Sequence, residues 1–144
     1  MRLVDANVLL YAVNEDAPRH RIAHDWLDEA LGLPEPVGFA WVVLLAFLRL
    51  STSPAVFTRP LSIGESFAVV RSWLERPAAM VVDPLPRHLA VLEGILAEMG
   101  TAAGLVTDAH LAALAIEHRA RVMSFDADFE RFPGLVRELP PSAE

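Results

Sequence analysis

Four aspartates stand at positions where an apolar run ends or an apolar helix begins. Asp5 follows the first apolar run, Asp126 follows a later one, Asp128 lies two residues beyond it, and Asp108 opens an apolar helical segment. If these carboxylates converge, two of them ~4 Å apart repel each other by about 4 kcal/mol at an effective dielectric of ~20. A hard divalent cation such as Mg²⁺ or Mn²⁺ relieves that repulsion, and such sites typically hydrolyse phosphodiesters with metal-activated water.

Each aspartate also has a purely structural interpretation. Aspartate is a favoured helix N-cap, so Asp5, Asp108 and Asp126 could serve only to cap the helices that follow them. Taken one at a time, capping is the better interpretation, except at Asp5, where Asn7 lies just beyond it in a hydrophobic stretch and the two interpretations are balanced. The joint pattern of the three acids favours a metal site.

The composition excludes several other chemistries. All 12 basic residues are arginines and there is no cysteine, which rules out a Walker A lysine, a Schiff base, a thiol nucleophile and a cysteine-based zinc site. A receiver domain of the response-regulator type also places aspartates on an α/β sheet, but it depends on a lysine that is absent here. The net charge of −7 argues weakly against a nonspecific nucleic-acid binder and leaves a metal-dependent nuclease open.

Length and hydropathy predict one soluble domain. The 144 residues fit a single domain over 1–139 followed by a tail, 140–144, that is expected to fray, and a hydrophobic fraction of 53% is enough for a substantial core. No apolar run approaches the ~20 residues that a membrane span needs, and the N-terminus shows no charged leader. We therefore expect a cytoplasmic location and no membrane partner.

Short apolar runs alternate with helical patterns along the whole chain. The predicted strands are 3–4, 36–39, 80–82, 121–125 and 135–136, and the predicted helices are 6–13, 19–31, 41–50, 63–76, 86–99 and 108–118. This alternation predicts an α/β fold with a mainly parallel sheet of about five strands and helices on both faces. Ligands of such sheets gather outside the carboxyl ends of the strands, where Asp5 and Asp126 are expected.

The remaining polar residues are interpreted as structural. No histidine is assigned to the metal: His20 and His24 are expected on a solvated face, and His88 and His118 suit roles at helix ends. The helix over 41–50 is apolar nearly all round and is expected in the core. Its one arginine, Arg49, is expected to form a structural ion pair rather than to meet the acidic site or a phosphate.

Three segments together resemble a known family. Residues 4–12 (VDANVLLYA) resemble the opening motif of PIN-domain ribonucleases, residues 105–115 (LVTDAHLAALA) resemble the third acidic motif, and residues 124–129 (SFDADF) resemble the C-terminal motif. The closest subgroup is the VapC-type toxins of prokaryotic toxin–antitoxin pairs. The resemblance covers residues 3–135, and it is the order and spacing of all three motifs that makes it specific.

The resemblance implies both a fold and a function. It implies a PIN-like α/β/α sandwich and a Mg²⁺-dependent endoribonuclease in which Asp5, Asp108 and Asp126 bind the metal and Asp128 is a possible auxiliary. It also implies an RNA substrate, a homodimer, and a small antitoxin that covers a hydrophobic groove and places a basic side chain in the acidic site.

The sequence departs from the family at one position. Most members carry a glutamate in the helix after the second strand, and the matching residue here is Ala46. A missing ligand would loosen the ion or leave a site for one metal only, unless Asp128 or Glu15 replaces it. The alternative function is therefore a non-catalytic PIN-like domain that binds RNA or protein.

Overall fold

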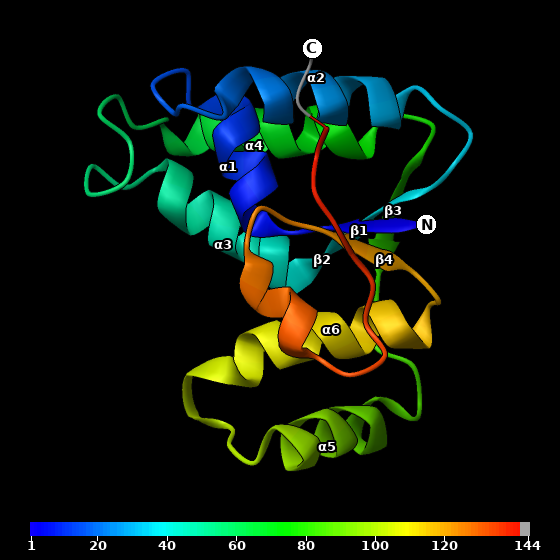
Figure 1. Ribbon diagram of the computed structural model, residues 1–144. Coiled ribbons are helices and arrows are strands. Elements are labelled where there is room, and N and C mark those ends of the chain that lie inside the picture. The colour runs from blue at the N-terminus through cyan, green and yellow to red at the C-terminus, as the bar shows by residue number, and fades with distance from the viewer. Residues whose placement is uncertain (142–144) are drawn as a thin grey trace.

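A computed structural model describes residues 1–141 and shows an open α/β sheet covered by helices (Figure 1). The strands are β1 (Arg2–Val4), β2 (Val37–Ala40), β3 (Ala79–Val82), β4 (Arg121–Met123) and β5 (Arg137–Glu138). The α-helices are α1 (Ala6–Val13), α2 (His20–Leu31), α3 (Trp41–Ser51), α4 (Ile63–Leu74), α5 (His88–Met99) and α6 (Val106–Glu117). Two short 3₁₀ helices, η1 (Ala103–Leu105) and η2 (Ala127–Arg131), precede α6 and follow β4.

All five strands are parallel and lie in the order β3-β2-β1-β4-β5. Helices α1, α2 and α4 lie on one face of the sheet, α6 lies on the other, and α5 packs outside α6 (Figure 1). This arrangement confirms the predicted three-layer α/β/α class and its mainly parallel sheet. Because β1 sits between β2 and β4, the first strand of the chain is the central strand of the sheet.

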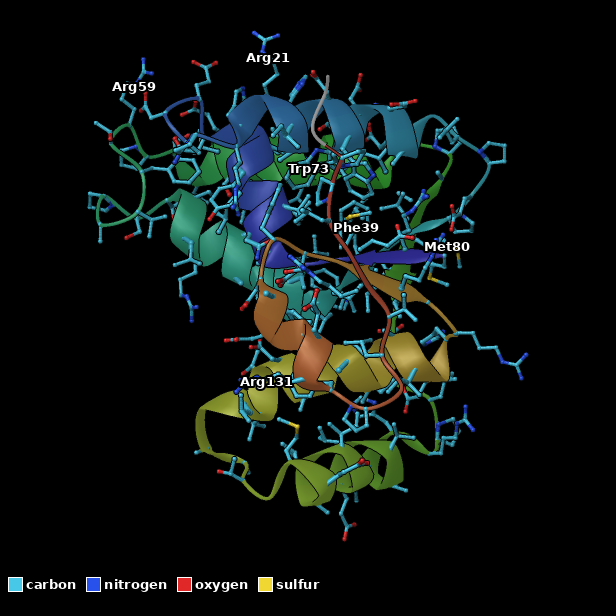
Figure 2. The ribbon with its side chains drawn as sticks, in the orientation of Figure 1. Arg21, Phe39, Arg59, Trp73, Met80 and Arg131 are labelled. Atoms are coloured by element: carbon cyan, nitrogen blue, oxygen red, sulfur yellow. The ribbon has the colours of Figure 1, made fainter. Side chains whose placement is uncertain are left out.

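The centre of the sheet is closely packed. Leu3 and Val4 of β1 are completely buried. Beside them, a Cβ on Gly38 would lie 2.8 Å from a methyl carbon of Val82, so this position in β2 requires glycine. On the face covered by α4, the rings of Phe39 and Trp73 stack with centroids 6.2 Å apart (Figure 2). Burial of this apolar surface is what positions the strand ends that carry the candidate site.

Two features of the outer elements differ from the predictions. The edge strand β5 falls at Arg137–Glu138 instead of 135–136, because it is held by main-chain bonds to β4 and by charged side chains rather than by apolar burial. Helix α3 is buried on one face only, since Trp41 and Leu45 are 52% and 58% exposed. A helix that is apolar all round therefore presents an apolar face at the surface of this chain.

The amino ends of the central strands are joined by alternating charges. Glu35, just before β2, pairs with Arg2 (3.0 Å) and Arg121 (2.9 Å). Glu138 of β5 accepts from the same two arginines, and the amino group of Met1 lies 3.3 Å from Glu35. We call Arg2, Glu35, Arg121 and Glu138 the paired-charge edge.

Helix α5 attaches to the molecule through α6 and a polar chain. Only Ile95 of α5 is buried, whereas α6 is buried along most of its length. His88 of α5 bonds through Nδ1 to Glu117 (2.9 Å) and through Nε2 to Nδ1 of His110 (2.8 Å), both on α6. His88 lies at the start of a helix, as predicted, but its ring links two helices side by side instead of capping one.

The C-terminal tail is only partly described. Pro140 is buried rather than frayed, and residues 142–144 of the predicted tail 140–144 lie outside the described part of the chain. None of the helices within residues 1–141 combines the length and apolar character required to cross a membrane.

Candidate functional site

The candidate site lies at the carboxyl ends of the two central strands. Asp5 follows β1 and Asp126 follows β4 after two residues, and these strands pair in parallel with Val4 opposite Met123. The N–H of Asp5 also donates to the carbonyl of Met123 at 3.0 Å. Adjacent parallel strands thus bring two acids that are far apart in sequence to one edge of the sheet, as predicted.

Asp5 is held by three hydrogen-bond donors. Its Oδ1 accepts from the N–H of Ala6 at 2.7 Å, and its Oδ2 accepts from Ser124 Oγ at 2.7 Å and from Asn7 Nδ2 at 3.2 Å. Burial raises the pKa of Asp5, the bonds from Ser124 and Ala6 oppose this rise, and the charge of Asp126 adds to it. The carboxylate is therefore fixed in orientation and costly to ionise without a nearby cation.

Ser124 and Asn7 connect the two strand ends, and sequence reasoning assigned neither of them to the site. The fully buried Ser124 hydroxyl donates to Asp5 and accepts from the N–H of Asp126 at 3.0 Å and from Asn7 Nδ2 at 3.1 Å. Asn7 Oδ1 in turn accepts from the N–H of Phe125 at 3.2 Å. A polar side chain in an apolar segment needs a partner, so Asn7 was the available signal.

Asp108 joins the same group of charges from α6. It lies in the first turn of the helix, whose N-terminal residue Leu105 makes no side-chain cap. Burial raises the pKa of Asp108, the charges of Asp5, Asp126 and Asp128 raise it further, and the charge of Arg131 lowers it. We call Asp5, Asp108, Asp126 and Asp128 the carboxylate cluster.

An aspartate can cap a helix and belong to the carboxylate cluster at the same time. Asp5 is the N-cap of α1, and Asp126 is the N-cap of η2, where it accepts from the N–H of Asp128 at 2.8 Å. Asp108 caps nothing, because α6 begins two residues earlier than predicted. The structural interpretation is therefore correct for two of the acids without removing them from the cluster.

A cavity of about 170 Å³ opens between α3, α6 and the end of β1. Asp5 and Asp108 provide its charged lining, and Thr107 and Ala46 also line it. Ala46 thus borders the same space as two of the acids, with a methyl group where the family pattern has a carboxylate. The rest of the lining is apolar: Ala6, Val42, Val43 and Leu111.

The two proposed substitutes for the missing acid lie in different places. Glu15 lies 4.0 Å from Arg59 in a separate pocket, away from the cavity, so it does not replace the ligand. Asp128 contributes to the charge on Asp108, is 64% exposed, and lies 3.9 Å from Arg131. Arg131 lies beside the start of α6 (Figure 2).

The donor chemistry of the cluster fits a hard divalent cation. Neighbouring acids add to the raised pKa of Asp5 and of Asp108, and carboxylate oxygens are the ligands that Mg²⁺ and Mn²⁺ prefer. Within residues 1–141, no group of three histidine or acidic side chains is close enough to enclose an ion by itself. This suits Mg²⁺, which keeps several waters and is usually held by one or two carboxylates.

Two expectations about basic side chains are wrong. Arg49 is exposed and makes no ion pair with any residue in 1–141, so it reaches solvent directly. His20 is half-buried, and its Nδ1 bonds to the carbonyl of Tyr11 at 2.8 Å, while His24 is exposed beside Asp25.

Comparisons with known proteins agree with this geometry. The PIN domain family matches residues 2–135. Ribonuclease VapC37 of Mycobacterium tuberculosis (strain ATCC 25618 / H37Rv) is 51% identical over 142 residues and 99% of each chain. Ribonuclease VapC33 of the same strain is 41% identical over 135 residues and 94% of each chain.

Solved structures share the fold at low sequence identity. VapBC2 from Rickettsia felis, bound to a DNA fragment from its promoter, superposes with a TM-score of 0.72 at 18% identity, covering 96% of this chain and 97% of that one. FitAcB from Neisseria gonorrhoeae superposes with a TM-score of 0.61 at 22% identity over 96% and 97% of the two chains.

Proposed function

The chain belongs to the PIN-domain family, in its VapC group, and on that premise we propose that it is a metal-dependent endoribonuclease and the toxin of a toxin–antitoxin pair. The observation that carries the proposal is the convergence of Asp5, Asp108 and Asp126, whose charges act on one another. The printed names of the VapC37 and VapC33 relatives as ribonucleases support the reaction class.

The proposed metal is Mg²⁺, with Mn²⁺ as a substitute, and its proposed ligands are Asp5, Asp108 and Asp126, which would bind it directly or through its waters. When bound, it would activate water and offset charge on the phosphoryl oxygens of RNA. Ser124 and Asn7 hold the Asp5 carboxylate in one orientation before any ligand arrives. This preorganisation avoids a rearrangement of the acid during the reaction.

The other side chains of the site define its polarity. Arg131 supplies the positive charge that acts on Asp108 from the side of η2. Ala46 leaves the cavity without a further carboxylate, so fewer negative charges compete with the phosphate of the substrate. The two effects act together to lower the repulsion between an RNA backbone and an acidic site.

We also propose a cognate antitoxin and a homodimer. Two helices present pairs of exposed apolar side chains four residues apart, Trp41 and Leu45 on α3 and Ile63 and Phe67 on α4. Exposed apolar surface of this kind is typical of protein interaction sites. Further support comes from a toxin–antitoxin complex from Klebsiella pneumoniae, which shares the fold with a TM-score of 0.61 at 15% identity.

Ala46 favours one alternative, a non-catalytic PIN-like domain that binds RNA or protein. Without the usual acid, the cluster holds fewer ligands for an ion. Calorimetric titration with Mn²⁺ separates the two functions: heat of binding that is lost on Asp108→Asn supports the nuclease, and no binding at millimolar Mn²⁺ supports the alternative.

The main test is RNA cleavage by the purified chain. We expect cleavage of a structured RNA with Mg²⁺ or Mn²⁺, none in excess EDTA, and a loss of about a hundredfold or more with Asp126→Asn. The matched control is Glu15→Gln, which removes an acid from outside the carboxylate cluster and should leave cleavage unchanged. Cleavage that persists in EDTA, or in Asp126→Asn, would contradict the proposal.

A further inference from the structure

A positively charged aromatic surface adjoins the carboxylate cluster. The ring of Phe125, the residue before Asp126, packs against Tyr11 of α1 with centroids 5.4 Å apart and an interplanar angle of 52°. The guanidinium carbon of Arg19 lies 5.0 Å from the centroid of the same Phe125 ring. We call Tyr11, Arg19 and Phe125 the Arg–aromatic platform.

Hydrogen bonds connect the platform to the candidate site. The N–H of Phe125 donates to Asn7, and Asn7 bonds to Asp5. Its other side is fixed as well, since His20, the neighbour of Arg19, bonds to the carbonyl of Tyr11 at 2.8 Å. Hydrogen bonds therefore join the backbone of Phe125 to Asp5 and the backbone of Tyr11 to His20.

The charge of Arg19 is available to a ligand. Six of the twelve arginines make ion pairs within residues 1–141, and Arg19 is not among them. Its side chain is exposed, and Phe125 and Tyr11 are partly exposed. An aromatic ring has no net charge, so a guanidinium that stacks on the ring keeps its positive charge. Arg19 can therefore still attract an anion.

We propose that the Arg–aromatic platform binds the nucleotide of single-stranded RNA next to the phosphate that is cleaved. Bases stack on aromatic rings and guanidinium planes, and arginine binds phosphate oxygens through its planar fork of donors. This inference rests on the proposed function and deepens it, because it assigns the contact between an acidic protein and its polyanionic substrate. The platform supplies binding energy on one side of the cluster without adding a charge to the cluster itself.

The test is binding and cleavage of a fluorescein-labelled single-stranded RNA by four variants. Arg19→Ala should weaken binding about tenfold, mainly through KM rather than kcat, and should make the salt dependence shallower by about 0.7 in the log–log slope, the value for one lost phosphate contact. Phe125→Leu should weaken binding by a similar factor with an unchanged salt slope, because stacking is lost and charge is kept.

The matched control is Arg21→Ala. Arg21 lies two residues away, is exposed, and points away from the body of the molecule at the outer side of α2 (Figure 2). It should leave both affinity and salt slope as in the parent chain. Arg19→Lys should retain the salt slope while recovering only part of the affinity, since lysine keeps the charge without the planar fork.

The outcomes separate this inference from the proposed function. If the parent chain cleaves RNA and Arg19→Ala behaves like Arg21→Ala, the platform does not bind RNA and the nuclease assignment stands. If the parent chain neither binds nor cleaves RNA with Mg²⁺ or Mn²⁺, both are overturned. Melting temperatures within about 2 °C of the parent would show that each variant is folded.

Discussion

The two ends of the sheet carry charges in opposite arrangements. At the amino ends of the strands, the paired-charge edge alternates Arg2, Glu35, Arg121 and Glu138 so that each charge faces its opposite. At the carboxyl ends, the carboxylate cluster gathers acids around a small cavity, with Arg131 as a nearby counter-charge. Because β1 is only three residues long, the two arrangements lie at opposite ends of one short strand.

The pKa of one acid from each arrangement shifts in the opposite direction: that of Glu35 is lowered and that of Asp5 is raised. Slight burial would raise the pKa of Glu35, but bonds from Arg121 and the N-terminal amine and the charge of Arg2 lower it. Burial raises the pKa of Asp5, and the charge of Asp126 adds to the rise. Charges that lower one another's energy stabilise the fold, whereas charges kept together at a cost indicate a site prepared for a ligand.

The largest expected effect concerns the support of the carboxylate cluster. Ser124→Ala removes the donor to Asp5 and the acceptor of the Asp126 N–H, so we expect RNA cleavage to fall roughly 10- to 100-fold. The measurement is the cleavage rate at saturating Mg²⁺ and at limiting Mg²⁺. Ser72→Ala, which removes an exposed hydroxyl on α4, is the control, and an equal loss in both variants would remove Ser124 from this role.

The second prediction is a substitution that stabilises the folded chain instead of destabilising it. Because the pKa of Asp108 is raised in the folded chain, its charge opposes folding at neutral pH, and Asp108→Asn should raise the free energy of unfolding. Solvent screening of this partly exposed carboxylate limits the expected gain to roughly 0.5 kcal/mol. The gain should shrink as the pH falls through the raised pKa and Asp108 takes up a proton. Denaturant unfolding at pH 7 and pH 4 measures it.

The exposed Asp83 provides the comparison for Asp108. Asp83→Asn should leave the free energy of unfolding unchanged at both pH values. A loss of stability in Asp108→Asn at pH 7, measured without added metal, would contradict the view that the cluster is held at a cost.

The smallest effect is at the paired-charge edge. The folded pKa of Glu35 lies below its ordinary value of 4.5, so its contribution to stability is present above that value and is lost as the pH falls through the folded pKa. Glu35→Gln should lower stability at pH 7 by a few tenths of a kcal/mol, because the pairs are partly exposed, and the deficit should vanish in acid. Melting curves in low and high salt test this, and an unchanged difference at 1 M salt would exclude a charge effect.

The parts of the molecule that sequence reasoning predicts are those with a local signal. Isolated acids after short apolar runs indicated Asp5 and Asp126. The helix predicted from residue 63 begins there, with a capping box in which Ser62 and Glu65 exchange two bonds of 3.1 Å. The start of α6 was predicted two residues late, and for this reason the alternative interpretation of Asp108 as a helix cap does not hold.

The parts that were missed depend on contacts between distant segments. The sequence around Ser124 gives no sign of a special role. That role arises only because Asp5, 119 residues away, lies beside it. His88 is joined to Glu117 across two helices, a pairing that no spacing in the sequence indicates. Arg49 was expected to need a partner because its helix is apolar, but that helix has an exposed face.

The position of β1 at the centre of the sheet has a consequence for synthesis of the chain. Residues 2–4 are made well before their partner β4 and the acids that complete the cluster. At ~5–20 residues per second, roughly 6–24 s pass between the addition of Asp5 and that of Asp126. A growing chain therefore carries no complete carboxylate cluster during that interval, and the proposed nuclease centre first exists after Asp126 and Asp128 have been added.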